Sequence, residues 1–217
     1  MSMTANQCLT RGRIFLAHWK QLESESGEAL NLRDGSGKAA FEADLEALEN
    51  EIKAAHRAQD GEGTSRASLS DGRGELLDLL RGFRQAVAFH LRGTPYAENL
   101  PTLPPLTSAE AIFFKSFEAA SARWAEIDGL AEGTFAGFAP PLVLRGGMTR
   151  AQFDSAIEQG RDSHQSRTNH AETADSLQAK RDSLIAPLRK KMTAYRDAVL
   201  FHFGSDSSHS QTLPTLE

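Results

Sequence analysis

The second half of this 217-residue chain repeats the first half, and this duplication restricts its possible folds more than any other feature. The segment FRQAVAFH ends at His90, and the similar segment YRDAVLFH ends at His202, 112 positions later. The same offset relates LRDG at 32–35 to LRGG at 144–147. A fixed spacing shared by separate segments indicates a duplicated structural unit.

The repeat covers nearly the whole chain. Trp19 and Trp124 correspond at a shorter offset of 105 positions, which places an insertion of about seven residues in the second copy, within 133–142. We predict a first helical repeat at 1–106 and a second at 107–217, and the two can share one core.

Apolar residues recur at helical spacing in both copies, which predicts an all-α fold. The predicted stripes are Phe41, Leu45, Leu48 and Ile52; Leu76, Leu79, Leu80, Phe83, Val87 and His90; Phe153 and Ile157; and Leu188, Met192, Tyr195, Val199 and His202. Two shorter aromatic helices are predicted around Trp19 and Trp124. We expect a pseudo-twofold helical bundle with long, antiparallel, coiled-coil-like helices.

The middle of each copy allows two arrangements. Residues 59–74 contain four glycines, which favours a loop, whereas 171–186 contain none. Either both copies form helical hairpins, or the second copy has one long helix and the first an interrupted one. Pro187 favours a helix start near Asp182 or Ser183 over a kink within a long helix.

Two short repeated motifs are predicted to be structural. The LRDG and LRGG segments precede long helices, and Thr149 is a plausible N-cap for the second one. The motif LPTL occurs at 100–103 and 213–216, where its proline favours an extended path. We expect it to lay leucines over the end of the bundle rather than to bind a proline-recognising partner.

Composition excludes several classes of partner. The 24 Lys and Arg residues are interspersed with 29 Asp and Glu, giving a net charge of −5, so we expect no nucleic-acid binding. No apolar run is long enough for a signal peptide or a membrane span, which predicts a cytoplasmic protein without membrane insertion. Cys8 is the single cysteine and is expected in a mobile terminus, away from any base.

No catalytic motif is found, so we predict that the protein is not an enzyme and has no catalytic residue, metal site or cofactor. The chain contains no Glu-x-x-His pair of the kind that builds di-iron sites in helical bundles. His90 and His202 are related by the repeat, as are Arg84 and Arg196. These four residues are the candidate ligand or interface positions, and structural roles for them are favoured.

A Trp-bearing helix, the turn LRxG or LxGG, the segment (F/Y)RxAVxxxF and the motif LPxL occur in this order in both copies. This pattern resembles an uncharacterised group of bacterial tandem-repeat helical proteins. The resemblance implies a helical repeat architecture and brings with it no activity, cofactor or site residue.

These features predict a non-catalytic helical interaction or assembly protein, which binds a protein partner or itself. The alternative is a small-ligand or metal-binding bundle, in which Arg84, His90, Arg196 and His202 converge. A third hypothesis uses the aromatic insertion at 135–141 as an exposed docking surface, although it could equally plug the bundle.

Overall fold

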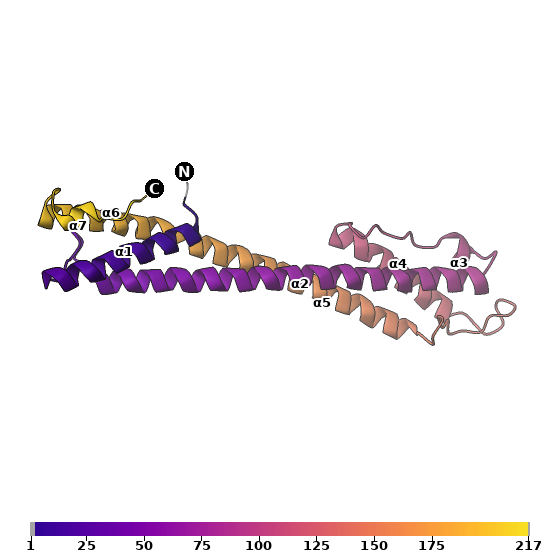
Figure 1. Ribbon diagram of the computed structural model, residues 1–217. Coiled ribbons are helices and arrows are strands. Elements are labelled where there is room, and N and C mark those ends of the chain that lie inside the picture. Colours follow the sequence, from indigo (N-terminus) through magenta and orange to yellow (C-terminus); the bar gives the residue numbers. More distant parts are fainter. Residues whose placement is uncertain (1–2, 217) are drawn as a thin grey trace. The chain divides into compact units, whose positions relative to one another are not determined.

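The computed structural model describes residues 3–216, and these form helices joined by turns and loops, the longest of which is 129–149 (Figure 1). The helices are α1 (Ala5–Ser26), α2 (Lys38–His90), α3 (Pro95–Glu98), α4 (Glu110–Asp128), α5 (Arg150–Ser183), α6 (Ile185–Phe203) and α7 (Ser208–Gln211). Within the described residues there is no strand, and an isolated bridge joins Asn31 and Gly37. The predicted all-α class is confirmed.

Local sequence explains where several helices begin and end. Thr4 and Gln7 form a reciprocal capping box at the start of α1, and Gly27 ends this helix with a φ of 71°. The predicted N-cap of α5 is confirmed, because Thr149 and Gln152 exchange the same two hydrogen bonds. The left-handed conformation at Gly27 has little steric cost only for a residue without a Cβ.

The interruption of the long helices lies in the second copy rather than the first. α2 passes through the glycine-rich residues 59–74 as continuous helix, so the predicted loop there is wrong. Each glycine lowers helix propensity by about 1 kcal/mol, but apolar stripes before and after this segment pack in cores and outweigh that preference. The second copy is divided at Leu184, between α5 and α6.

Pro187 lies in the first turn of α6, where its missing N–H removes no essential hydrogen bond. The predicted helix start near Asp182 or Ser183 is therefore two to three residues too early, because α6 begins at Ile185. Leu184 keeps helical backbone angles, with φ −81° and ψ −16°.

The described chain divides into two compact units. Unit 1 contains residues 3–61 and 171–216, and unit 2 contains residues 62–170. Each unit thus takes segments from both halves of the sequence. The predicted boundary between 106 and 107 marks the repeat in the sequence, whereas the compact units follow other boundaries.

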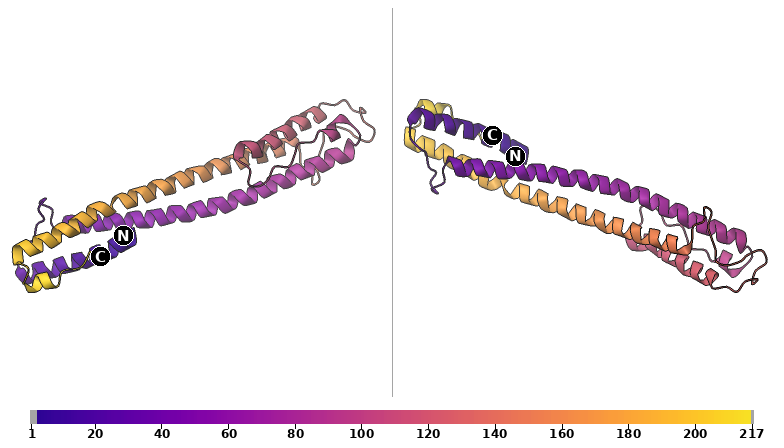
Figure 2. Two further views of the ribbon diagram at one scale, coloured as in Figure 1. Left: turned by 90° about the horizontal axis from the view of Figure 1, so that it is seen from above. Right: turned by 90° about the horizontal axis from the view of Figure 1, so that it is seen from below.

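The core of unit 1 forms around Trp19 on α1. Its indole stacks on the ring of Tyr195 from α6, with centroids 4.6 Å apart, and lies 5.9 Å from the ring of Phe41 on α2. Both views of Figure 2 show the indigo α1 beside the yellow α6. Other buried members of this core are Phe15, Leu22, Leu45, Leu48, Ile52, Leu188, Met192 and Val199.

The core of unit 2 forms around Trp124 on α4. Its ring centroid lies 5.4 Å from that of Phe83 on α2 and 5.5 Å from that of Phe153 on α5. Other buried members are Leu76, Leu80, Val87, Phe113, Phe114, Phe117, Ile127 and Ile157. The predicted apolar stripes are therefore confirmed, except at His90 and His202, which are exposed.

The aromatic insertion of the second copy packs onto the core of unit 2. Phe138 is buried in it, and Phe135 contacts Tyr96 edge to face at 6.1 Å. The hypothesis that the insertion is an exposed docking surface is therefore wrong for these two rings. Removing these two rings from water stabilises the fold, because each phenylalanine has a large apolar surface area.

Cys8 is fully buried on α1, with its Sγ 3.9 Å from the carbonyl oxygen of Ile185. The prediction of a mobile terminus is therefore wrong for this residue. Burial raises the pKa of the thiol, although the charge of Arg189 partly opposes this. Cys8 behaves as a small apolar core residue.

The apolar stripe of α5 is interrupted at Gly160 because there is no room for a side chain at this position. A Cβ added at Gly160 would come within 2.6 Å of Leu76 Cδ1 and 3.3 Å of Phe114 Cε1. The glycine allows α5 to approach its neighbours closely, and the core is filled by side chains from α2 and α4 instead.

Candidate interaction site

Two phenylalanines at matching positions of the repeat are exposed. Phe89 near the end of α2 is 80% exposed, and Phe201 near the end of α6 is 85% exposed. In each case the ring meets the following histidine edge to face, with centroids 4.9 Å and 5.4 Å apart. Single exposed apolar residues are common, but two at one repeat position that serve neither core require a separate explanation.

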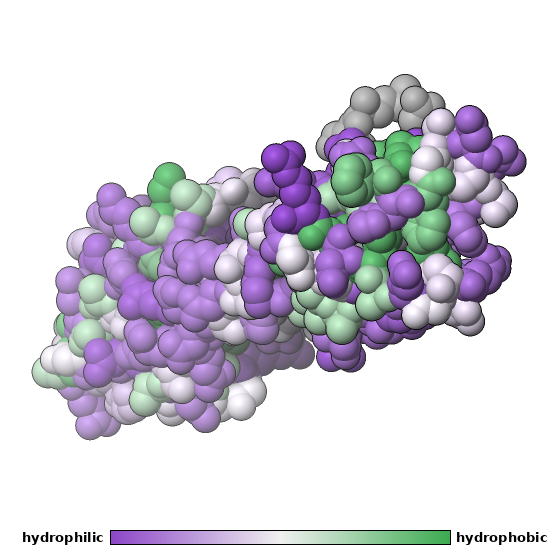
Figure 3. All heavy atoms as spheres, turned by 90° about the vertical axis from the view of Figure 1, so that its left-hand side faces the viewer, coloured by the Kyte–Doolittle hydropathy of each residue, from purple (hydrophilic) through white to green (hydrophobic). Residues whose placement is uncertain are grey.

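Phe201 lies beside an open groove of about 580 Å³ in unit 1. One wall comes from the turn before α2 and the other from the outer face of α6. The lining residues are Asn31, Arg33, Ala194, Asp197, Ala198, Phe201 and His202. Figure 3, which faces the left-hand side of Figure 1, shows green, apolar atoms gathered among purple, polar ones on this side of the molecule.

The groove in unit 1 carries one exposed cation and one exposed anion. Arg33 and Asp197 both lie on its rim, and neither forms an ion pair within residues 3–216. Protein interfaces commonly combine an aromatic anchor at the centre with polar residues on the rim.

Unit 2 has a smaller groove of about 370 Å³ at the corresponding place. Gly82, Gln85 and Arg145 line it at the repeat positions of Ala194, Asp197 and Arg33. The uncharged Gln85 replaces the anion of unit 1. The carboxylate that lines this groove is Asp78, which pairs with Arg81 at 2.6 Å, so its described lining residues include no unpaired anion of the kind found in unit 1.

The four predicted site residues belong to different units. Arg84 and His90 lie in unit 2, where Arg84 donates a hydrogen bond to the carbonyl oxygen of Pro101 and His90 is exposed beside Phe89. Arg196 and His202 lie in unit 1, and of these His202 lines the groove.

Arg84 therefore holds the LPTL segment against unit 2, which is a structural role. The predicted packing of that motif is confirmed for Leu100, Leu213 and Leu216, while Leu103 is 40% exposed. Ligand binding by the four residues stays a prediction. Within residues 3–216, no three His, Cys, Asp or Glu side chains are grouped so that they could hold a metal ion.

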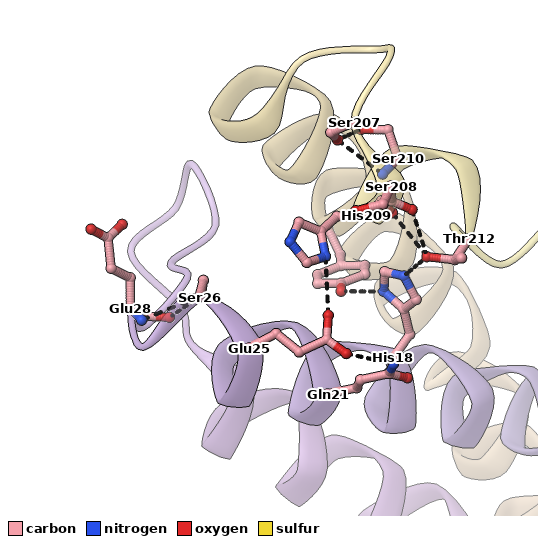
Figure 4. A network of polar contacts seen from close by, with 11 residues as sticks. His18, Gln21, Glu25, Ser26, Glu28, Ser207, Ser208, His209, Ser210 and Thr212 are labelled. Carbon is pink, nitrogen blue, oxygen red and sulfur yellow. Dashed lines mark hydrogen bonds and ion pairs between the residues drawn. The ribbon is translucent and has the colours of Figure 1, made fainter.

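A polar network that the sequence did not reveal joins α1, α6 and α7 in unit 1 (Figure 4). His18 Nδ1 lies 2.7 Å from the Tyr195 hydroxyl, and His18 Nε2 lies 3.0 Å from Thr212 Oγ1. The Thr212 hydroxyl donates to the carbonyl oxygen of Ser208 at 3.1 Å, so it accepts from His18 Nε2–H. His18 Nδ1 then accepts from Tyr195, and the neutral imidazole satisfies both neighbours.

Burial lowers the pKa of His18, although the carbonyl of His209 and the charge of Glu25 partly oppose this. Burial also raises the pKa of the Tyr195 hydroxyl, and the charge of Glu23 adds to this effect. Phe83 occupies the repeat position of Tyr195 in unit 2 and has no hydroxyl. The network is therefore specific to unit 1, and the repeated core does not require it. It links α1 to the end of α7 through hydrogen bonds.

The network predicts a loss of stability as the pH falls below about 6.5. Because the pKa of folded His18 lies below its ordinary value of 6.5, the unfolded chain binds the proton more readily. The stabilisation is complete above that value and is lost as the pH falls through the folded pKa. We expect His18→Asn to reduce this pH dependence in urea unfolding, whereas His56→Asn, at an exposed position of α2, should leave it unchanged.

Before each long helix, a carboxylate accepts a backbone hydrogen bond and pairs with a cation at the helix start. We call this arrangement the carboxylate clasp, and it was not predicted from the sequence. Glu23 accepts hydrogen bonds from the backbone N–H of Leu30 at 3.2 Å and from Trp19 Nε1 at 2.9 Å, and it pairs with Lys38. Here Lys38 is the first residue of α2. The clasp therefore links the end of α1, the turn and the start of α2.

In unit 2, Asp128 accepts from the backbone N–H of Leu142 at 2.8 Å and lies 3.7 Å from Arg150 Nε. The members of this clasp match those of unit 1 at the repeat offsets. Asp128 corresponds to Glu23 at 105 positions, and Leu142 and Arg150 correspond to Leu30 and Lys38 at 112 positions. Comparison of residue identities missed this clasp, whereas comparison of charge at both offsets would have found it.

Comparison with known proteins gives no significant match to a family model, a curated protein or a solved structure. The resemblance to bacterial tandem-repeat helical proteins stays a prediction. Among the helices of residues 3–216, none combines the length and apolar character that crossing a membrane requires.

Proposed function

We propose that this protein is a non-catalytic helical assembly element that associates with a second copy of itself through the groove of unit 1. The observation that carries the proposal is Phe201, an almost fully exposed aromatic ring beside that groove. Large aromatic side chains that enter a partner's pocket supply much of the binding energy at protein interfaces.

We further propose that the chain is a duplicated unit with pseudo-twofold symmetry and an antiparallel, coiled-coil-like seam. The matching ring contacts of Trp19 and Trp124 support the symmetry, because each indole packs between one ring from its own copy and one from the other copy. Two ion pairs support antiparallel packing within unit 1: Lys191 with Asp44 at 2.5 Å and Lys180 with Glu51 at 2.5 Å.

Charge complementarity favours a second copy as the occupant of the groove. A twofold interface uses the same patch on both subunits, so that patch must complement itself. Unpaired Arg33 and Asp197 allow this, because the cation of one copy can face the anion of the other. In the groove of unit 2, Gln85 stands at the position of the anion, and the carboxylate that does line it, Asp78, is already paired with Arg81.

A charge-reversal series tests the proposal by light scattering coupled to size exclusion. We expect the wild type to be a dimer whose fraction falls on dilution, and Arg33→Asp or Asp197→Arg to shift it toward monomer. The double variant should restore the dimer, because it re-creates both pairs in reverse. Arg145→Asp, at the matching position of unit 2, is the control and should leave the dimer intact.

Phe201→Ser should weaken the dimer by about 30-fold, which corresponds to about 2 kcal/mol for a central aromatic anchor. Phe89→Ser is its matched control in unit 2. A wild type that stays monomeric at every concentration would overturn self-association. A monomer with stoichiometric metal that is lost in His90→Ala and His202→Ala would instead support the alternative of a metal-binding bundle.

A further inference from the structure

Two arginines and a histidine lie together in unit 2 beside the first turn of α4. Arg73 extends from α2, and His164 and Arg167 extend from α5; all three are half-buried. Burial lowers the pKa of Arg73, the nearby charge of Arg167 lowers it further, and Glu110 acts in the opposite direction. The charge of Arg73 is therefore affected by one nearby cation and one nearby carboxylate.

Arg73 is held rigidly in this position. Its Nη1 donates to the carbonyl oxygens of Leu106 and Ser108 at 2.6 Å and 3.0 Å, and its guanidinium lies 4.6 Å from the centre of the Phe113 ring. These contacts place a positive charge at a defined point before any ligand arrives. Such preorganisation reduces the entropy that binding must overcome.

Several donors of the group lack hydrogen-bond partners. The Nε atoms of Arg73 and Arg167 are buried and make no hydrogen bond in the described structure. Arg167 also forms no ion pair within residues 3–216. His164 Nδ1 lies 2.9 Å from Glu110 Oε2, close enough for an ion pair, but the two are not aligned as a hydrogen bond. Buried donors without partners commonly mark the place of an ion or ligand.

The corresponding positions of unit 1 carry apolar residues. The repeat positions of Arg73, His164, Arg167 and Glu110 are occupied there by Ile185, Ile52, Ala55 and Ala5. Three of these four side chains are buried in the core of unit 1, and Ile185 packs against it. Packing of the core therefore does not itself require charge at these repeat positions, whereas the charged residues near this corner of unit 1, such as Arg181, Asp182 and Arg189, come from other positions.

We infer that Arg73, His164 and Arg167 form a binding site for a phosphate-type oxyanion. Guanidinium groups bind such oxyanions through paired, charge-assisted hydrogen bonds. The start of α4, a helix of 19 residues, adds partial positive charge from its free N–H groups. This site is independent of the groove in unit 1 and of the proposed self-association.

Titration of the full chain with inorganic phosphate by isothermal calorimetry tests the site, with chloride at equal ionic strength as the reference. We expect saturable binding to the wild type and a rise of the unfolding temperature in phosphate. Arg167→Ala should weaken binding at least about tenfold, because it removes one of two guanidinium groups. It removes no intramolecular ion pair, so the variant should stay folded in chloride.

Arg81→Ala is the control, because this arginine is exposed on α2 and, within residues 3–216, pairs only with Asp78, at 2.6 Å. A second variant replaces the three side chains by their unit 1 counterparts, Arg73→Ile, His164→Ile and Arg167→Ala, and should abolish binding. Titration with phosphoserine separates the two sources of the anion: binding at least as tight as that of phosphate indicates a phosphorylated ligand, and weaker binding indicates the free ion. Absence of phosphate binding to the wild type, or equal binding by Arg167→Ala, would overturn the inference.

Discussion

Replacing Trp19 by alanine is expected to lower the free energy of unfolding by about 3–5 kcal/mol, the range for truncation of a fully buried large aromatic residue. Trp19 is completely buried and stacks on Tyr195, so the substitution leaves a cavity where α1, α2 and α6 meet. Trp124→Ala should lower the free energy of unfolding by a similar amount in unit 2, because the Trp124 indole packs on Phe83 and Phe153 in the same manner.

Each tryptophan variant has a matched control on the same helix. Ile14 on α1 is 53% exposed and Ile112 on α4 is 63% exposed, so Ile14→Ala and Ile112→Ala should cost less than about 1 kcal/mol. Chemical denaturation followed by circular dichroism measures all four. The chain has two tryptophans, so the fluorescence of the remaining one reports on the other unit. A loss below about 1 kcal/mol for Trp19→Ala would contradict the core described here.

Replacing Glu23 by alanine is expected to cost about 3 kcal/mol, because it leaves three donors of the carboxylate clasp without their acceptor. The carboxylate is 15% exposed and accepts from Trp19 and Leu30 while pairing with Lys38. Glu23→Gln should cost less, since the amide oxygen can still accept one of these bonds. Glu42→Gln is the control, because that carboxylate is 50% exposed in a surface pair with Lys20.

The clasp also predicts the response to acid. Burial alone would raise the pKa of Glu23, but the hydrogen bonds from Lys38, Leu30 and Trp19 outweigh it and hold the pKa below the ordinary value of 4.5. The stabilisation is therefore complete above pH 4.5 and is lost as the pH falls through the folded pKa. Urea unfolding of the wild type and Glu23→Gln across this range should converge at low pH. Parallel curves would show that ionised Glu23 does not stabilise the fold.

Patterns confined to one helix face could be predicted from the sequence. The spacing of Phe41, Leu45, Leu48 and Ile52 indicated a buried stripe, and all four side chains are buried. The LRxG turns were also predictable, because a glycine in the left-handed region follows from local backbone sterics.

The candidate sites could not be predicted in the same way, because their members come from distant segments. The groove of unit 1 combines Arg33 with Asp197, and the polar network combines His18 with Thr212. Neither pairing has a fixed spacing that a motif search detects. Phe201 looked like one more apolar residue of a helix, and only its position on the outer face of α6 reveals its exposure.

The sequence by itself determined the helical class, the buried apolar positions of the helices and the turns before the long helices, because each depends on local periodicity or on glycine geometry. The tertiary structure decided which copy is interrupted and which segments share a core. Helix preferences of about 1 kcal/mol at each glycine of 59–74 are small beside the burial of rings such as Trp19 and Trp124. Packing between distant segments therefore prevails over local preference, and it places α6 beside α1 in unit 1.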